Sequence, residues 1–235
     1  FASPRGGGGP GVGAICCAEH LVSAMPQAEN NRVSSALYGN ANMALISYGY
    51  IRMMGEEGLR ESTAAAILSA NYMAAKLKDA YGIVYTGVTG RVGHELILDC
   101  RQFHSIGITE SDIAKRLMDF GYHAPTLSFP VHGTLMIEPT ESESLCEVDR
   151  FIDALLAIRK EISEVENGEV DAKENVLVNS PHAEYEVVAD EWNHPYSREK
   201  AAYPAAWVRE NKFWLPVCRV DNGWGDRNLV ARFEK

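Results

Sequence analysis

The chain has 235 residues, 46% of them hydrophobic, which is enough for one large core or two smaller ones. Its formal net charge is −10, from 22 basic and 32 acidic side chains, and no stretch is rich in lysine or arginine. Nucleic-acid binding requires a basic footprint, so this class of partner is excluded. No apolar run reaches the roughly 18 residues of a membrane span, and we expect no membrane partner.

The cysteines and histidines give no metal signal. Five cysteines lie at neither zinc nor redox spacing, which favours reduced thiols in a cytoplasmic protein. No two of the candidate histidines share a metal-ligand spacing, so we interpret them as turn residues or hydrogen-bonded buried residues. They are His94, His104, His123, His132 and His182.

A glycine-rich run, "SPRGGGGPGVG", occupies residues 3–13. Its consecutive backbone N–H groups can cradle phosphate oxygens, although it matches neither the dinucleotide fingerprint nor a P-loop. A hinge, or a tight passage between packed elements, explains it equally well. Around it the first forty residues predict loop, a short apolar strand at 12–17, and loop again.

Two helices are predicted next. Residues 41–54 are mostly apolar and predict a largely buried helix, which Gly55 and Gly58 interrupt. Residues 59–80 predict a second helix that ends before Gly82. Its buried face contains Ile67, Ala70, Ala74 and Leu77.

Residues 82–165 alternate between strands and helices and predict a small α+β unit. The segments "GIVYTG", "HELILDCR", "TLSFP" and "GTLMIEP" are strand-like. Thr109 begins one helix and Gly121 ends it, whereas Thr140 and Glu143 predict a capping box before a longer amphipathic helix. This longer helix is expected to bury Phe151, Leu155, Ile158 and Ile162.

The acidic residues 164–175 form a connector, and we expect the Pro-, Trp- and Tyr-rich tail to be irregular but packed.

These segments together resemble a known family. The most specific is "DIAKRLMDFGYHAPTLSFPVHGTLMIEPTESES", residues 112–144, which we call the signature block. Others are "GGGGPGVG", "YIRMMGEEGL", "AILSANYMAAKL", "NHPYSREKAAYP" and "NKFWLPVCRVDNGWGDRNLV". Over nearly its whole length the chain resembles the C-terminal part of the glycine cleavage system P-protein, the decarboxylating glycine dehydrogenases.

The resemblance implies an α/β fold, the α+β C-terminal small domain of aspartate-aminotransferase-like, fold-type-I pyridoxal-phosphate enzymes. Residues 1–40 would then be a remnant of the large cofactor-binding domain, and residues 41–81 linking helices. Residues 82–165 would be the small domain, and residues 166–235 a tail packed on it.

The resemblance also implies a reaction, in which glycine is decarboxylated on pyridoxal phosphate and its aminomethyl group passes to the lipoyl arm of H-protein. A second P-protein subunit is the other implied partner. The family's Schiff-base lysine lies in His-Lys-Thr-Phe, and Phe1 matches that phenylalanine. We therefore expect the lysine two residues upstream of Phe1 and no catalytic residue within this chain.

Other residues receive roles from the same resemblance. The cofactor-binding candidates are the loop glycines Gly6, Gly7, Gly8 and Gly9. Tyr196 and Arg198 are candidates for the active-site entrance, with a purely structural role as the alternative. Without the lysine we expect this chain to retain no pyridoxal phosphate and to be inactive alone.

Two other functions stay open. One is another fold-type-I enzyme such as serine hydroxymethyltransferase, whose lysine also precedes a Pro-Arg-Gly-like loop, but "APT…EPTESE" argues against it. The other is a non-catalytic interaction module that docks H-protein or a partner subunit.

Overall fold

A computed structural model describes residues 11–25 and 39–229 of the chain. The chain divides into two compact units, Phe1–Ala64 and Ala65–Lys235, and each is considered by itself. In the first unit the described elements are a short 3-10 helix, η1 (Glu19–Ala24), and the first part of helix α1 (Ala41–Leu77). The predicted strand at 12–17 is wrong, because these residues have no regular structure and pair with no strand.

Helix α1 is broken at Gly55, whose φ of 62° lies in the left-handed region that favours glycine. The predicted interruption is therefore confirmed there, while Gly58 continues the helix. The predicted burial of residues 41–54 is wrong, because every one of these residues is exposed or half-buried. Among their apolar side chains, Leu45 and Met53 are clearly exposed.

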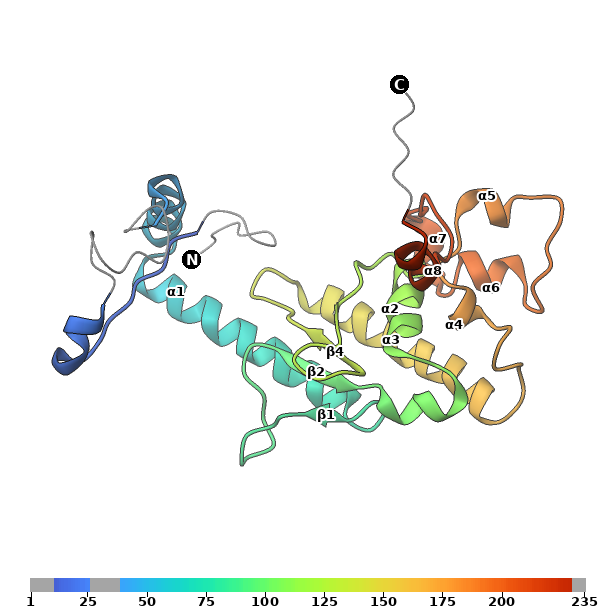
Figure 1. Ribbon diagram of the computed structural model, residues 1–235, viewed down its shortest axis with the longest axis horizontal. Coiled ribbons are helices and arrows are strands. Elements are labelled where there is room, and N and C mark those ends of the chain that lie inside the picture. The colour runs from blue at the N-terminus through green and yellow to red at the C-terminus, as the bar shows by residue number, and fades with distance from the viewer. Residues whose placement is uncertain (1–10, 26–38, 230–235) are drawn as a thin grey trace, which may run out of the picture. The chain divides into compact units, whose positions relative to one another are not determined.

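The second unit contains a four-stranded antiparallel sheet in the order β1-β2-β4-β3 (Figure 1). Its strands are β1 (Ile83–Val84), β2 (Leu96–Asp99), β3 (Thr126–Leu127) and β4 (Thr134–Ile137), each within a predicted strand segment. In the register, Leu96 pairs with Ile137 and Leu98 with Leu135. All four side chains are buried in the core, so one face of the sheet is its apolar inner face.

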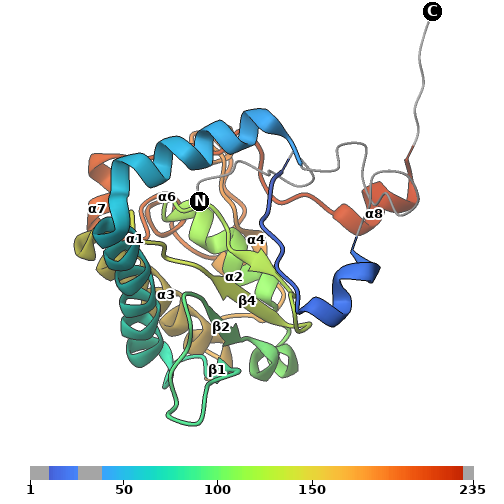
Figure 2. The same ribbon diagram turned by 90° about the vertical axis from the view of Figure 1, so that its left-hand side faces the viewer.

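Two helices pack into the same core. Helix α2 (Glu110–Asp119) begins with the predicted cap, a reciprocal capping box between Thr109 and Asp112. Helix α3 (Leu145–Glu166) buries three of its four predicted core residues and leaves Phe151 half-buried. The second part of α1 joins them through Ala70, Met73, Ala74 and Leu77, whereas Ile67 is 42% exposed. Figure 2 shows the sheet with these helices from a second side.

The predicted start of α3 is wrong. Its N-cap is Ser144, whose Oγ accepts a hydrogen bond of 3.2 Å from the Glu147 backbone N–H. Thr140 lies outside the helix at a φ of 55°, and its Oγ1 accepts instead from the Ser142 N–H. The Ser/Thr-x-x-Glu pattern occurs twice in the sequence, at Thr140 with Glu143 and at Ser144 with Glu147. The turn at Thr140 leaves only the second of them next to helical backbone.

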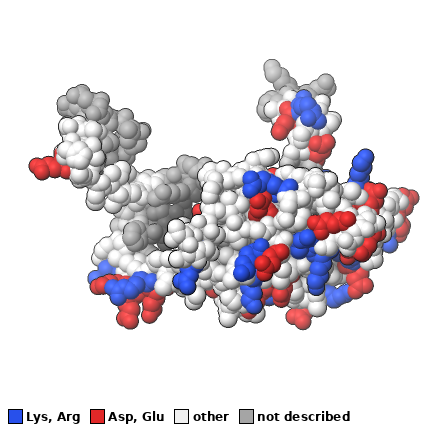
Figure 3. Space-filling model, turned by 90° about the horizontal axis from the view of Figure 1, so that it is seen from below, with Lys and Arg blue, Asp and Glu red and all other residues white. Residues whose placement is uncertain are grey.

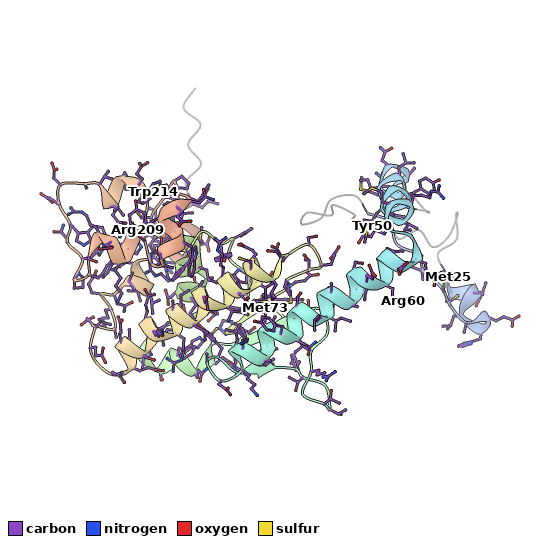
Figure 4. All side chains as sticks on the ribbon, turned by 180° about the vertical axis from the view of Figure 1, so that it is seen from behind. Met25, Tyr50, Arg60, Met73, Arg209 and Trp214 are labelled. Atoms are coloured by element: carbon purple, nitrogen blue, oxygen red, sulfur yellow. The ribbon has the colours of Figure 1, made fainter. Side chains whose placement is uncertain are left out.

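The tail is more regular than predicted, because short helices punctuate it. They are α4 (Val176–Asn179), α5 (Glu184–Val187), α6 (Arg198–Ala202), α7 (Ala206–Glu210) and α8 (Asn222–Arg227). It is packed as predicted, since Ala201, Ala202 and Val208 are buried. Within the tail, the Tyr203 ring contacts both the Trp214 ring and the guanidinium of Arg209. Figure 4 labels Arg209 and Trp214.

The face in Figure 3 carries lysine and arginine side chains interspersed with acidic ones. None of the helices in the described ranges combines the length and the apolar character needed to cross a membrane.

A fully buried arginine joins the tail to the helices. The Arg116 guanidinium on α2 donates to both Glu161 carboxylate oxygens on α3, at 3.0 and 2.7 Å, and to Asp119 at 3.0 Å. It also donates to the backbone carbonyls of Lys200 and Ala201 on α6. With two carboxylates and two carbonyls as acceptors, the buried charge is well compensated.

Arg116→Ala should therefore destabilise the second unit by about 3–5 kcal/mol, because Asp119 and Glu161 would stay buried without their counter-charge. Urea denaturation measures the change in the free energy of unfolding. The exposed Arg91→Ala is the control and should change it by less than about 0.5 kcal/mol. Equal effects of the two variants would contradict a structural role for Arg116.

The position of the α3 cap is tested by a second pair of variants. Ser144→Ala should cost about 1 kcal/mol of stability, because it removes the acceptor for an N-terminal N–H group of the helix. Thr140→Gly should be within about 0.5 kcal/mol of the parent, since relief of the left-handed threonine offsets the lost hydrogen bond to Ser142. A greater loss for Thr140→Gly, measured by denaturation, would show that Thr140 governs the start of the helix.

Candidate functional site

Two segments of the signature block line a cleft of about 480 Å³. Residues 122–126 and 136–139 form much of its wall, and α3 and the preceding turn contribute Glu143, Glu147, Val148 and Phe151. Met73 of α1 completes the lining, and Figure 4 labels it on the part of α1 that lies beside α3. Each of these lining residues belongs to the second unit.

The chain enters this cleft through the end of α2. Gly121, at a φ of 89°, donates its N–H to the Met118 carbonyl, and Tyr122 donates its N–H to the Leu117 carbonyl. These two bonds form a Schellman motif, which confirms Gly121 as the predicted helix end. The turn directs Tyr122 and the residues after it along the cleft wall.

A strained residue directly follows the lining segment 136–139. Thr140 follows Pro139, has a φ of 55°, and is β-branched, so its left-handed backbone is a true outlier. Such strain costs about 1–3 kcal/mol and concentrates at functional sites. The "EPTESE" turn therefore keeps a costly shape where it borders the cleft.

Tyr122 provides an unsatisfied polar atom within the lining. Its buried hydroxyl has no hydrogen-bond partner of good geometry among the described residues, and its ring meets Phe151 edge to face at 4.9 Å. Burial, followed by the nearby charge of Glu147, raises the pKa of Tyr122 above its usual value. Glu147 itself is paired with Arg150 at 2.8 Å. The tyrosine hydroxyl therefore stays protonated at neutral pH.

The two predicted entrance residues lie elsewhere, in the tail. The Tyr196 hydroxyl is 2.9 Å from Nε2 of His182, and its backbone carbonyl accepts from the Trp192 indole. Arg198 donates to the backbone carbonyls of Ala189 and Asp190 and lies over the Trp192 ring. The structure brings both residues into contact with Trp192, in contacts that hold the loop 188–197.

The cluster around Asp119 was missed as a unit by the sequence reasoning. The Asp119 carboxylate accepts from the ring and backbone N–H of His182, from Ser180 Oγ and from Arg116. Burial alone would raise the pKa of Asp119, but the His182 hydrogen bonds and the Arg116 charge hold it below its usual value. A usable signal was the position of Arg116 beside Leu117 on the apolar face of α2. His182 is fully buried and hydrogen-bonded, as the sequence suggested.

Comparison with known proteins assigns the chain to a family. The family model described as "Glycine dehydrogenase, C-terminal domain" matches residues 62–182, more than half of the chain and all of the signature block. The chain belongs to the glycine dehydrogenase C-terminal domain family.

Whole-protein relatives agree with this assignment. Proteins named "Glycine dehydrogenase (decarboxylating)" are 65% identical in Bacteroides thetaiotaomicron, 64% in Bacteroides fragilis and 57% in Flavobacterium johnsoniae. Each alignment covers 98% of this chain but 25% of the relative. The chain thus spans about a quarter of the length of the relatives it matches.

The clefts of this glycine dehydrogenase C-terminal domain do not fit pyridoxal phosphate by themselves. The cleft of the signature block is lined by three glutamates and by no lysine or arginine, so it offers neither a Schiff-base amine nor a cationic phosphate partner. A smaller cleft of about 190 Å³ contains Lys200, but Glu164 pairs with that lysine at 2.5 Å. The cofactor-binding candidates Gly6–Gly9 lie outside the described residues.

Among the lysines of the described residues, Lys212 has the surroundings that shift its pKa most. Its Nζ donates to the Asp119 carbonyl at 2.8 Å and lies over the Trp214 ring. Burial lowers its pKa to about 8. Within the described ranges no group of three or more histidine, cysteine or acidic side chains could hold a metal ion.

Tyr122→Phe tests whether the cleft hydroxyl lacks a partner in the folded chain. The variant should stay within about 0.5 kcal/mol of the parent, because no hydrogen bond is lost. Tyr81→Phe is the matched control, since the buried Tyr81 hydroxyl donates to the Leu155 carbonyl at 2.6 Å. It should lose about 1–3 kcal/mol in denaturation experiments, and an equal loss for Tyr122→Phe would reveal a partner.

Proposed function

We propose that this chain is the C-terminal portion of a pyridoxal-phosphate-dependent glycine decarboxylase, an oxidoreductase of glycine catabolism in the glycine cleavage system. In the proposed reaction, glycine is decarboxylated and its aminomethyl group passes to the lipoyl arm of H-protein. The observation that carries this proposal is the family match over a signature block of which two segments, 122–126 and 136–139, line one cleft. The small sheet with helices packed on it is compatible with the small domain of a fold-type-I enzyme.

The described residues suggest a division of labour in that enzyme. The cleft is acidic and apolar and offers no group that would hold the cofactor, so the chain supplies walls and positioning. The Schiff-base lysine is proposed to lie upstream of Phe1 in the longer protein, next to the loop of Gly6–Gly9. Tyr196 and Arg198 are proposed to border the entrance, where their mutual contacts with Trp192 would keep the loop in shape.

A chimaera tests the proposal. This chain replaces the matching quarter of the Bacteroides thetaiotaomicron relative, with which it shares 65% identity. The chimaera should bind pyridoxal phosphate with an absorbance band that survives dialysis, and should release CO₂ from glycine when lipoylated H-protein is present. The 235-residue chain alone should retain no such band, and borohydride reduction should label none of its lysines stoichiometrically.

Two outcomes would contradict the proposal in different ways. A folded chimaera that binds the cofactor without decarboxylating glycine would refute the proposed activity. Stoichiometric labelling of one lysine in the isolated chain would refute the placement of the cofactor lysine. Lys212→Arg controls for non-specific labelling, because a lysine with a lowered pKa reacts readily with an aldehyde.

A further inference from the structure

His194 lies in the loop between α5 and α6 with a carboxylate at each ring nitrogen. Its Nδ1 is 2.9 Å from Glu174 Oε1, and its Nε2 is 3.1 Å from Glu186 Oε1. A neutral imidazole has one N–H and one lone pair, so one nitrogen would turn its lone pair toward a carboxylate. Only the protonated ring can donate to both glutamates, whereas the neutral ring with its proton on Nε2 would accept at Nδ1 from the Asn179 amide N–H.

The groups around His194 leave these two contacts dominant. On the α4 side, Glu174 precedes the helix, and the Asn179 amide nitrogen lies 3.2 Å from Nδ1. Glu186 belongs to α5, and its second oxygen contacts the Cys218 thiol at 3.0 Å. The remaining neighbours are rings, with Tyr196 stacked on His194 at 5.1 Å and 14°, Trp192 at 4.7 Å, and the His182 ring at 6.2 Å. No lysine or arginine in the described ranges forms a salt bridge with either glutamate.

The balance of these surroundings favours the charged ring. Burial lowers the pKa of His194, but the hydrogen bonds to Glu174 and Glu186 and their charges outweigh it, so the pKa lies above the ordinary 6.5. Because this value is higher in the folded than in the unfolded chain, protonated His194 stabilises the fold below pH 6.5. That stabilisation disappears as pH rises through the folded value.

We propose that His194 is a proton-operated latch that fastens the loop 188–197 to the start of α4 and to α5. With the proton bound, one ring ties Glu174 and Glu186 together across the loop. When the proton leaves Nδ1, the bond from His194 to Glu174 is lost, and Asn179, which also donates to Glu174, becomes the donor to Nδ1. The second attachment, from Tyr196 through His182 to Asp119, stays in place, so the loosening is local.

This device is independent of the activity proposed above. It acts on the loop that carries Tyr196 and directly precedes Arg198, so the exposure of Tyr196 would depend on pH. The loop would be held most firmly while His194 is protonated and would loosen as the pH rises through the folded pKa of His194.

NMR titration of the histidine ring signals in the 235-residue chain, from about pH 5 to pH 9, tests the latch directly. His194 should titrate above 6.5, and Glu174→Gln and Glu186→Gln should each lower its midpoint. Amide hydrogen exchange, corrected for the intrinsic rate at each pH, should show protection in residues 188–197 falling across the same midpoint. Trp192 fluorescence should follow the same curve, because the two rings are in contact.

His194→Gln should remove this pH dependence, whereas the exposed His132→Gln should preserve it. A His194 midpoint at or below 6.5 in the unsubstituted chain would overturn the latch. So would an unchanged pH dependence of protection in His194→Gln. Since the titration needs no substitution, a variant that fails to fold does not prevent the test.

Discussion

Arg116 imposes the strictest constraint on the second unit, because its charge is completely buried and each of its partners must reach it. Glu161 comes from α3, and Asp119 lies on α2 with Arg116 itself. Two carbonyl oxygens come from α6. A guanidinium without these acceptors would be far too costly to bury. The interaction therefore fixes α2, α3 and the tail relative to one another, and Asp119 extends it to Ser180 and His182.

This constraint also explains how the cleft is built. Once α2 is held against α3, the turn at Gly121 sends residues 122–126 along the first half of α3. Strand β4 leads the other end of the signature block back to the same place, through the strained turn at Thr140. Two segments separated by nine residues, and paired at Thr126 and Met136, thus line one cavity. The glutamates and apolar side chains there suit a wall that positions other groups better than a centre that performs chemistry.

The tail shows a second way of using polar groups. Its short helices bury few apolar side chains, and hydrogen bonds from Arg198, Trp192, Tyr196 and two histidines hold the loop between α5 and α6. Such bonds contribute about 0.5–1.5 kcal/mol each when neutral and more when charged. A segment held in this way responds to protonation more than one held by a hydrophobic core, and His194 occupies the most exposed of these contacts.

Local patterns in the sequence determined the capping box at Thr109, the end of α2 at Gly121, the four strands and the break at Gly55, because each depends on residues within a few positions. The family also followed from contiguous segments. Tertiary structure alone decided which of two caps starts α3, whether residues 41–54 are buried, and where Tyr196 and Arg198 point. It alone brought Arg116 to Glu161, 45 residues away, and Asp119 to His182, 63 residues away. Contacts between distant residues leave no periodic trace in the chain, because they depend on the packing of whole elements.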